Sequence, residues 1–279
     1  MKTILEVLNG ATDFLEKRDI ESARLNAQYL LAHVLKKKRM DLYVEFETTL
    51  AENDLAPMRD LLRERAAGRP LQHLLGTAEF FGREFLCDKR ALIPRPETEQ
   101  LIEKILEKEG KQALHILDVG TGSGVIAITL ALECPDAQIF AIDASSEALD
   151  LAKANAQRLE VDQRIQFSHG DLIPAEKASY HYIVANLPYI PTGEIATLSQ
   201  EVKHDPVAAL DGGPDGTVLI KKLISKCPEF LEPGGRLYLE IGLAQAADLS
   251  AFLEAEKFRD IQAHRDYQGI ERFLSATYG

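Results

Sequence analysis

The feature that most constrains this chain is an apolar segment that runs into a glycine-rich turn and then into a second apolar segment. Residues 114–119 read as a buried strand, glycines occupy alternate positions from Gly120 to Gly124, and residues 125–132 read as a buried helix. Glycines at such a turn let the backbone at a helix N-terminus come close to a ligand. A dinucleotide fingerprint requires a further glycine where Val125 stands, so the segment fits NAD poorly.

The next apolar segment, residues 138–143, ends in an acid. Asp143 lies about 20 residues past the glycine-rich turn, where α/β folds usually place the acceptor for ribose hydroxyls. Together with the turn, this arrangement resembles the class I S-adenosylmethionine-dependent methyltransferases. The resemblance implies that the glycine loop holds the methionine part of the cofactor and that Asp143 holds its ribose.

A second motif, Asn186-Leu187-Pro188-Tyr189, follows the apolar segment 180–185. In a parallel sheet these residues lie at the carboxyl end of a strand, where open α/β sheets bind ligands. The Asn186 side-chain oxygen and the Leu187 carbonyl can accept hydrogen bonds from a planar NH2 group, while the Tyr189 ring stacks on its plane. Taken alone, the tetrapeptide is better explained as an ordinary turn. The glycine-rich motif upstream favours an active site.

Length and composition bound the class of protein. With 279 residues, 46% of them hydrophobic, the chain can bury one large core and a smaller domain. No apolar run approaches the ~18 residues of a membrane span, and Glu6 and Asn9 come too early for a signal peptide, so we expect a cytoplasmic protein with no membrane contact. Cys87, Cys134 and Cys227 are far apart, and the His residues lack ligand spacing, so we expect reduced thiols and no metal.

Charge is unevenly distributed along the chain. Residues 1–75 hold 12 basic and 12 acidic side chains, so the whole net charge of −12 lies in residues 76–279. An acidic catalytic half is a poor electrostatic match for a phosphate backbone, so we expect no direct nucleic-acid partner. The basic run at residues 36–39 is an exception. It is better interpreted as a solvated helix C-terminus than as a nucleic-acid or partner contact.

The hydrophobic pattern divides the chain into three parts. Residues 1–75 read as helices only, with one helix beginning at Asn53, and we expect this domain to dock a substrate. Residues 76–92 read as two short strands around a glycine turn, a hairpin linker. Residues 93–279 form the α/β domain.

Within the α/β domain, proline marks the start of one predicted helix and the end of another. Pro96 begins a helix that runs to about Glu109, and residues 216–231 read as a helix that Pro233-Gly-Gly235 ends before a strand at 235–242. Arg95, held between two prolines, has little backbone freedom. Its guanidinium can be aimed at a ligand carboxylate or at structural acids, and the pattern does not choose between them.

Five segments together resemble one family, the release-factor glutamine methyltransferases of the PrmC/HemK type. They read RPLQHLLGTAEFFGREF, LIPRPETE, LDVGTGSG, NLPY and EVKHDPVAALDGGPDG, and the match runs from about residue 20 to the C-terminus. The family usually has Asn-Pro-Pro-Tyr, whereas Asn-Leu-Pro-Tyr is also the form in adenine-N6 dimethyltransferases of ribosomal RNA. Because only the carbonyl of position 187 is needed, we expect Leu187 to be tolerated.

The resemblance implies a seven-stranded, mostly parallel Rossmann-like sheet with helices on both faces. It implies methyl transfer from S-adenosylmethionine to the side-chain N5 of the glutamine in the Gly-Gly-Gln motif of release factors, by a monomer. Asn186 and Tyr189 are the expected catalytic residues, and residues 186–189 the expected substrate site. The expected cofactor contacts are Gly120, Thr121, Gly122, Ser123, Gly124, Asp143, Asp171, Leu172, Asn186, Arg95 and Thr98. The alternatives are a ribosomal RNA adenine-N6 methyltransferase and a non-catalytic S-adenosylmethionine-binding regulator.

Overall fold

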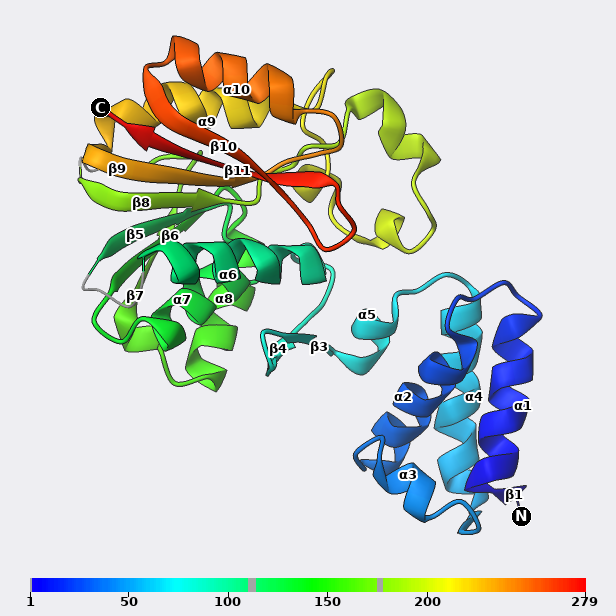
Figure 1. The fold of residues 1–279 in the computed structure, drawn as a ribbon. Helices are drawn as coiled ribbons and strands as arrows, with labels where there is room; N and C mark the ends of the chain where they lie inside the picture. Colours follow the sequence, from blue (N-terminus) through cyan, green and yellow to red (C-terminus); the bar gives the residue numbers. More distant parts are fainter. Residues whose placement is uncertain (1, 110–113, 175–177) are drawn as a thin grey trace. The chain divides into compact units, whose positions relative to one another are not determined.

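The computed structural model of the chain describes residues 2–109, 114–174 and 178–279. It comprises two units (Figure 1): Met1–Thr77 with Ser199–His204, and Ala78–Leu198 with Asp205–Gly279. The short segment Ser199–His204 therefore packs with the N-terminal unit although it lies far along the chain. The assignment of residues 1–75, 76–92 and 93–279 to docking, linking and catalysis stays a prediction.

The N-terminal unit is helical, as expected, with one exception. Its helices are α1 (Ile4–Glu16), α2 (Ala23–Leu35), α3 (Asp41–Val44), α4 (Glu52–Ala66) and α5 (Leu71–Leu75). The expectation of helices alone is wrong, because β1 (Lys2–Thr3) and β2 (Thr49–Leu50) form an antiparallel pair. Two-residue strands are too short to leave an alternating pattern in the sequence. Helix α4 also begins one residue before Asn53, after Ala51, whose N–H donates to the Asp54 carboxylate over 3.1 Å.

A buried polar contact fastens the segment Ser199–His204 to this unit. Arg65 is 3% exposed, its Nε donates to Asn26 Oδ1 over 2.7 Å, and its guanidinium pairs with Glu201. A buried guanidinium left without its acceptors is strongly unfavourable, so these bonds hold the segment in place. Around them lies an apolar core contributed mainly by α1, α2 and α4.

The second unit is built on a seven-stranded sheet in the order β10-β11-β9-β8-β5-β6-β7. Its strands are β5 (His115–Val119), β6 (Gln138–Asp143), β7 (Ile165–His169), β8 (Tyr180–Ala185), β9 (Leu231–Glu240), β10 (Phe258–Arg265) and β11 (Glu271–Tyr278). The five strands from β9 to β7 run parallel, and β11 and β10 are added antiparallel. The predicted mostly parallel sheet is confirmed.

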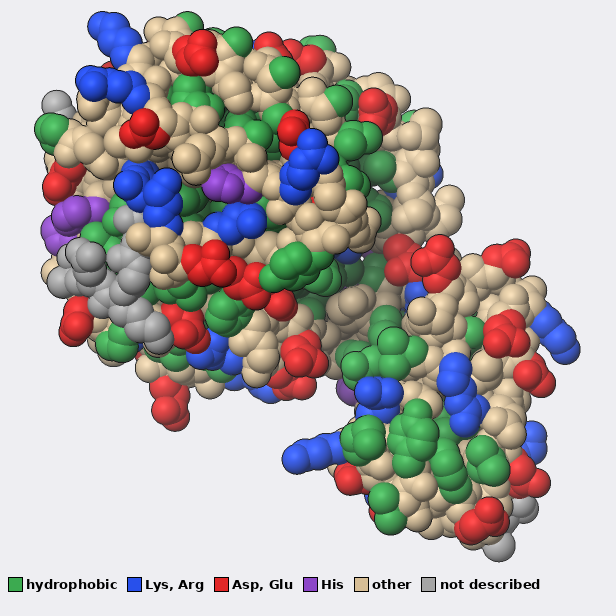
Figure 2. Space-filling view, viewed as in Figure 1, with side chains coloured by type: hydrophobic (Ala, Val, Ile, Leu, Met, Phe, Trp, Pro, Cys, Tyr) green, Lys and Arg blue, Asp and Glu red, His purple; other side chains and the backbone are tan. Residues whose placement is uncertain are grey.

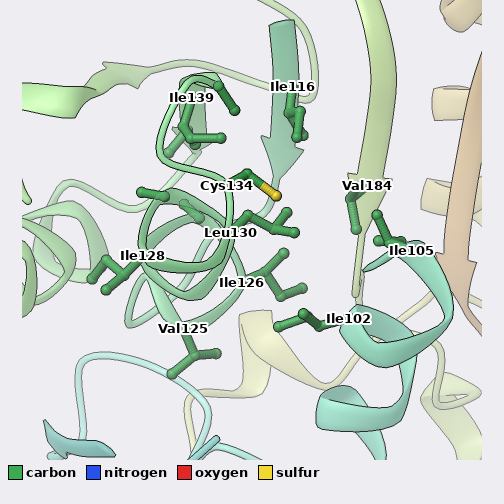
Figure 3. Close-up of a cluster of buried hydrophobic side chains, with 14 of the residues drawn as sticks. Ile102, Ile105, Ile116, Val125, Ile126, Ile128, Leu130, Cys134, Ile139 and Val184 are labelled. Atoms are coloured by element: carbon green, nitrogen blue, oxygen red, sulfur yellow. The ribbon is translucent and has the colours of Figure 1, made fainter. Parts of the chain in front are cut away.

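Helices cover both faces of this sheet (Figure 1). They are α6 (Pro96–Glu109), α7 (Val125–Glu133) and α8 (Ser146–Arg158) on one face, and α9 (Val218–Lys226) and α10 (Ala246–Ala255) on the other. Successive strand residues alternate between the two cores: Ile116 and Val184 pack with α6 and α7, as Figure 3 shows, whereas Leu117 belongs to the core under α9 and α10. This alternation buries both faces, which explains the continuous apolar runs.

The remaining sequence predictions concern the hairpin, the start of α6, the end of α9 and the start of the strand after it. Strands β3 (Thr77–Phe80) and β4 (Arg83–Leu86) form the predicted hairpin, and α6 begins at Pro96 as predicted. The predicted helix 216–231 is wrong at its end, because α9 stops at Lys226 and a 3-10 turn with Pro228 follows. Residues 233–235 do not separate a helix from a strand. They lie inside β9, where the pairing register with β8 shifts.

Candidate active site

A cavity of about 470 Å³ opens at the carboxyl ends of the parallel strands, a volume typical of small-molecule sites. The strand order reverses between β5 and β8, and open α/β sheets bind ligands at such a switch point. Most of the predicted site residues line it: Arg95, Thr98, Gly120, Thr121, Gly122, Ser123, Asp143, Asp171, Leu172, Asn186, Leu187 and Pro188. The structure therefore brings together predicted residues that are up to 93 positions apart in the sequence, from Arg95 to Pro188.

A buried acid, Asp118, accepts hydrogen bonds from the glycine loop at residues 120–124 and from the helix that follows it. Asp118 is fully buried, and its Oδ2 accepts from Thr121 Oγ1 over 2.6 Å and from the Ala127 N–H over 3.1 Å. Burial raises the pKa of this carboxyl to about 7. Gly120 has a φ of +71°, and a Cβ there would lie 2.8 Å from Leu187 Cδ2. Glycine is therefore required where this loop meets the Asn186–Tyr189 loop.

Asp143 combines a structural role with free acceptor capacity. Its Oδ2 accepts from the Gly122 N–H and its Oδ1 from the Ser145 N–H, each over 2.8 Å. A carboxylate oxygen has two lone pairs, so each oxygen keeps one for a ligand hydroxyl. Asp143 thus orients the glycine loop and can still receive both hydroxyls of a ribose.

The Asn186 carboxamide is tied to helix α6 through a hydrogen bond. Its Nδ2 donates to Thr98 Oγ1 over 3.1 Å, and the Thr98 hydroxyl donates to Glu240 Oε2 over 2.7 Å. The second carboxylate oxygen, Oε1, accepts from the Tyr189 hydroxyl over 3.3 Å. Burial raises the pKa of Glu240 to about 7 and that of Tyr189 above its ordinary value. Tyr189 thus bonds directly to the buried Glu240 carboxyl group, and Asn186 is linked to it through Thr98.

A glycine-rich segment braces the backbone of the Asn186–Tyr189 loop. A Cβ on Gly212 would lie 2.6 Å from the Pro188 carbonyl oxygen, and one on Gly216 would overlap the Tyr189 carbonyl oxygen. That carbonyl also accepts from Gln245 Nε2 over 2.9 Å. The segment is therefore packed against the loop with no space for side chains between them.

Two predicted residues, Gly124 and Tyr189, are not among the described residues that line the cavity. Gly124 precedes α7 with a φ of +84°, and a Cβ there would lie 2.9 Å from Ile128 Cδ1, so its evident task is helix packing. The Tyr189 ring packs beside the apolar core under α9 and α10. Their roles in binding stay predictions.

Three further residues of the predicted cofactor site are Arg95, Asp171 and Leu172, and the first two have protein partners. Arg95 Nη2 donates to the buried Asp205 Oδ2 over 2.6 Å, so a structural acid holds the guanidinium. Asp171 pairs with Lys222. Leu172 has a φ of 67°, a conformation rare for a non-glycine residue, and such strain often marks a ligand site.

Sequence reasoning missed Asp118, Glu240 and Gln245 as site residues. Asp118 and Glu240 left a signal, because each is an acid that directly follows apolar residues of a strand, Ile116 and Leu117 in β5 and residues 237–239 in β9. A charged group in a buried strand needs a partner or a function. Gln245 left none, since it follows an ordinary loop and its two side-chain hydrogen bonds are to backbone atoms.

Family comparisons agree with this geometry. Residues 6–76 match the PrmC N-terminal domain, and residues 96–213 match the methyltransferase small domain. A release factor glutamine methyltransferase of Chlorobaculum tepidum is 39% identical over 98% of this chain and 96% of its own, and one of Geobacter sulfurreducens is 38% identical over 99% and 97%. This chain belongs to the release factor glutamine methyltransferase family.

Solved structures support the fold of this family member. The hMettl16 catalytic domain in complex with MAT2A 3′UTR hairpin 1 matches with a TM-score of 0.61 at 16% identity, over 79% of this chain and 81% of its own. A methyltransferase from Pyrococcus furiosus matches with a TM-score of 0.54 at 16% identity, over 82% and 100%. These similarities concern the methyltransferase sheet and carry no information about the substrate.

The described residues contain neither a membrane-spanning helix nor a cluster of metal ligands. None of their helices has the length and apolar character to cross a membrane. No group of three or more His, Cys, Asp or Glu side chains among them is placed to hold a metal ion.

Proposed function

We propose that this protein transfers a methyl group to the side-chain N5 of the glutamine in the Gly-Gly-Gln motif of peptide-chain release factors. The observation that carries the proposal is the position of Asn186 at the cavity. Its amide donor is bound to Thr98, which leaves its Oδ1 as the acceptor for a substrate NH2 group. The near full-length relatives named release factor glutamine methyltransferase support it.

The residues present fit S-adenosylmethionine as the cofactor. Gly120 and Gly122 have positive φ values and line the cavity, so backbone rather than side chains would meet the methionine part. Asp143 would hold the ribose, with Leu172 beside the adenine. When bound, S-adenosylmethionine supplies an electrophilic methyl group on a sulfonium.

The contribution of this chain to the reaction is positioning. An amide nitrogen is a weak nucleophile because its lone pair is delocalised into the carbonyl. Asn186 Oδ1 and the Leu187 carbonyl would accept from the two N–H groups, while Tyr189 would stack on the amide plane. Well-oriented positioning can lower a barrier by about 7 kcal/mol or more. No base is needed before transfer, since the nitrogen becomes acidic as it gains the methyl group.

Transfer of a labelled methyl group tests the proposal. We expect label in intact release factor, none in a factor whose Gly-Gly-Gln glutamine is replaced by alanine, and none in ribosomal RNA. Label in RNA would establish the adenine-N6 alternative, and no label in any acceptor together with tight cofactor binding would establish the regulator. Because the proposed substrate is a translation factor, the proposal includes a cytoplasmic location, and a monomer stays the expectation.

A further inference from the structure

A hydrogen-bonded chain of three side chains runs from the cavity into the core. Asn186 follows β8 and lines the cavity, Thr98 lies in the first turn of α6, and Glu240 ends β9. Thr98 is 2% exposed and Glu240 1% exposed, so both of these side chains are shielded from water. The two links measure 3.1 Å and 2.7 Å. Both bonds lie in the second unit. The proposed transfer uses Thr98 only as the partner of the Asn186 NH2 group and gives Glu240 no part.

The chemistry of the three groups fixes the direction of each bond. Above the raised pKa of about 7, the ionised Glu240 carboxylate can only accept, so the single hydroxyl proton of Thr98 is donated to Glu240. The Thr98 oxygen is then left as an acceptor, and the only part of the Asn186 carboxamide that can meet it is the NH2 group. The amide orientation therefore follows from the chemistry of its partners.

We infer that Thr98 and Glu240 are positioning residues, which turn the carboxamide of Asn186 so that its oxygen, and not its NH2 group, meets the substrate. The inference rests on the proposed function. A glutamine amide presents two N–H donors to such an acceptor, whereas a glutamate carboxylate presents none. The chain would thereby favour glutamine over glutamate at the same position.

Other groups around Glu240 agree with an acceptor role. The Tyr189 hydroxyl donates to its second oxygen over 3.3 Å, so both oxygens receive a proton donor. The Arg272 guanidinium, on β11, favours the ionised carboxylate, and Glu97, on α6, opposes it. A single carboxylate thus orients both side chains of the motif that the proposed function uses.

The test compares three variants of the full-length enzyme. Thr98→Val keeps the shape of the side chain but removes the hydroxyl, and Thr98→Ser keeps the hydroxyl. Thr129→Val is a matched control, because Thr129 is fully buried on α7 and its hydroxyl has no hydrogen-bond partner among the described residues. Steady-state kinetics with release factor, calorimetry with S-adenosylmethionine and urea unfolding are measured for each.

We expect Thr98→Val to lower kcat by about 10-fold or more, because the part-buried Asn186 NH2 group loses its acceptor and the carboxamide rotates. KM for the release factor and the dissociation constant of S-adenosylmethionine should change by less than about threefold, since positioning affects the transition state most. Thr98→Ser should restore kcat to within about threefold of wild type, and Thr129→Val should leave kcat unchanged.

Three results would overturn the inference. In the first, Thr98→Val turns over at the wild-type rate. In the second, it weakens cofactor binding at unchanged kcat, which would make Thr98 a cofactor ligand. In the third, Thr98→Ser is as slow as Thr98→Val. A wild-type enzyme that methylates no release-factor glutamine would instead overturn the proposed function and the inference with it.

Discussion

Gly212 approaches Pro188 so closely that a Cβ atom on the glycine would lie 2.6 Å from the proline carbonyl oxygen. The same Cβ would lie 2.8 Å from the Tyr189 Cα. Real Cβ atoms essentially never come this close to backbone, so the two loops fit together only while position 212 has no side chain. The glycine-rich segment 211–216 thus acts as a support for the residues that are proposed to grip the substrate.

Replacement of Gly212 by alanine should therefore displace the Asn186–Tyr189 loop. We expect a loss of about 100-fold in turnover, because displacement of a positioning group by about 1 Å costs this much. Gly193→Ala is the matched control, since a Cβ there meets no atom within 4 Å. Gly193 also lies only four residues after Tyr189, the last residue of the loop. Equal single-turnover rates for the two variants would show that the segment does not support the loop.

The Asn186–Thr98 bond sharpens a prediction about charge. Asn186→Asp keeps the shape and the acceptor oxygen, but it replaces the NH2 donor by an oxygen that faces the Thr98 lone pair. With Glu240 just beyond, two carboxylates would share one hydroxyl proton. We expect single-turnover rates at least about 100-fold below wild type, similar to those of Asn186→Ala. A fast Asn186→Asp enzyme would mean that Asn186 only accepts hydrogen bonds.

Parts of the chain that were predicted correctly have local signals. The run 180–185 and the helix 125–133 are buried on both sides, so their apolar character gives their place in the core, and their lengths and the turn residues beside them give their type. Thr98 and Glu240 have no such signal for one another, because they are 142 residues apart and come together only when α6 packs on β9. Arg65 and Glu201, 136 residues apart, are hidden in the same way. Contacts of this kind depend on the folded topology.

Asp143 yields a prediction about cofactor affinity. Asp143→Ala removes the proposed ribose acceptor and also the acceptor for the Gly122 N–H, so the glycine loop loses a support. We expect S-adenosylmethionine binding to weaken by roughly 1 to 3 kcal/mol, the usual cost of leaving buried polar groups unpaired. Isothermal titration calorimetry measures this directly. An unchanged affinity in a folded Asp143→Ala protein would remove Asp143 from the cofactor site.

The exposed apolar side chains of the N-terminal unit lead to a prediction about docking. Figure 2 shows hydrophobic side chains gathered on a face of this unit. Independently of the figure, Met40 and Val44, at the two ends of α3, are 64% and 87% exposed. We expect Met40→Ser combined with Val44→Ser to raise KM for the release factor about 10-fold at unchanged cofactor affinity, as loss of exposed interface anchors does. Deletion of residues 1–75 is a less specific test, because it would also remove Arg65 from Glu201.

Tyr267→Ser provides the control for this docking prediction. Tyr267 is 81% exposed and belongs to the other unit, so the variant removes a large exposed side chain outside the proposed docking face. If it raises KM as much as the double variant does, or if the double variant leaves KM unchanged, the helical unit is not the docking site.

Glu240 provides a prediction about pH and stability. Burial raises its pKa to about 7, whereas a glutamate in an unfolded chain has a pKa of about 4.3. The folded protein therefore holds this proton more tightly than the unfolded chain. The stabilisation that results is complete below pH ~4 and is lost as the pH rises through about 7. Glu240→Gln cannot titrate, so it should gain stability relative to wild type over this range.

Urea unfolding of both proteins from pH 4.5 to 8 measures the effect. We expect the free energy of unfolding of Glu240→Gln, minus that of wild type, to increase by roughly 3 kcal/mol across the range. The pKa of Asp118 is also raised to about 7 by burial, but this group is present in both proteins and cancels in the difference. A difference that stays constant with pH would mean that Glu240 titrates at the same pH in the folded and the unfolded chain.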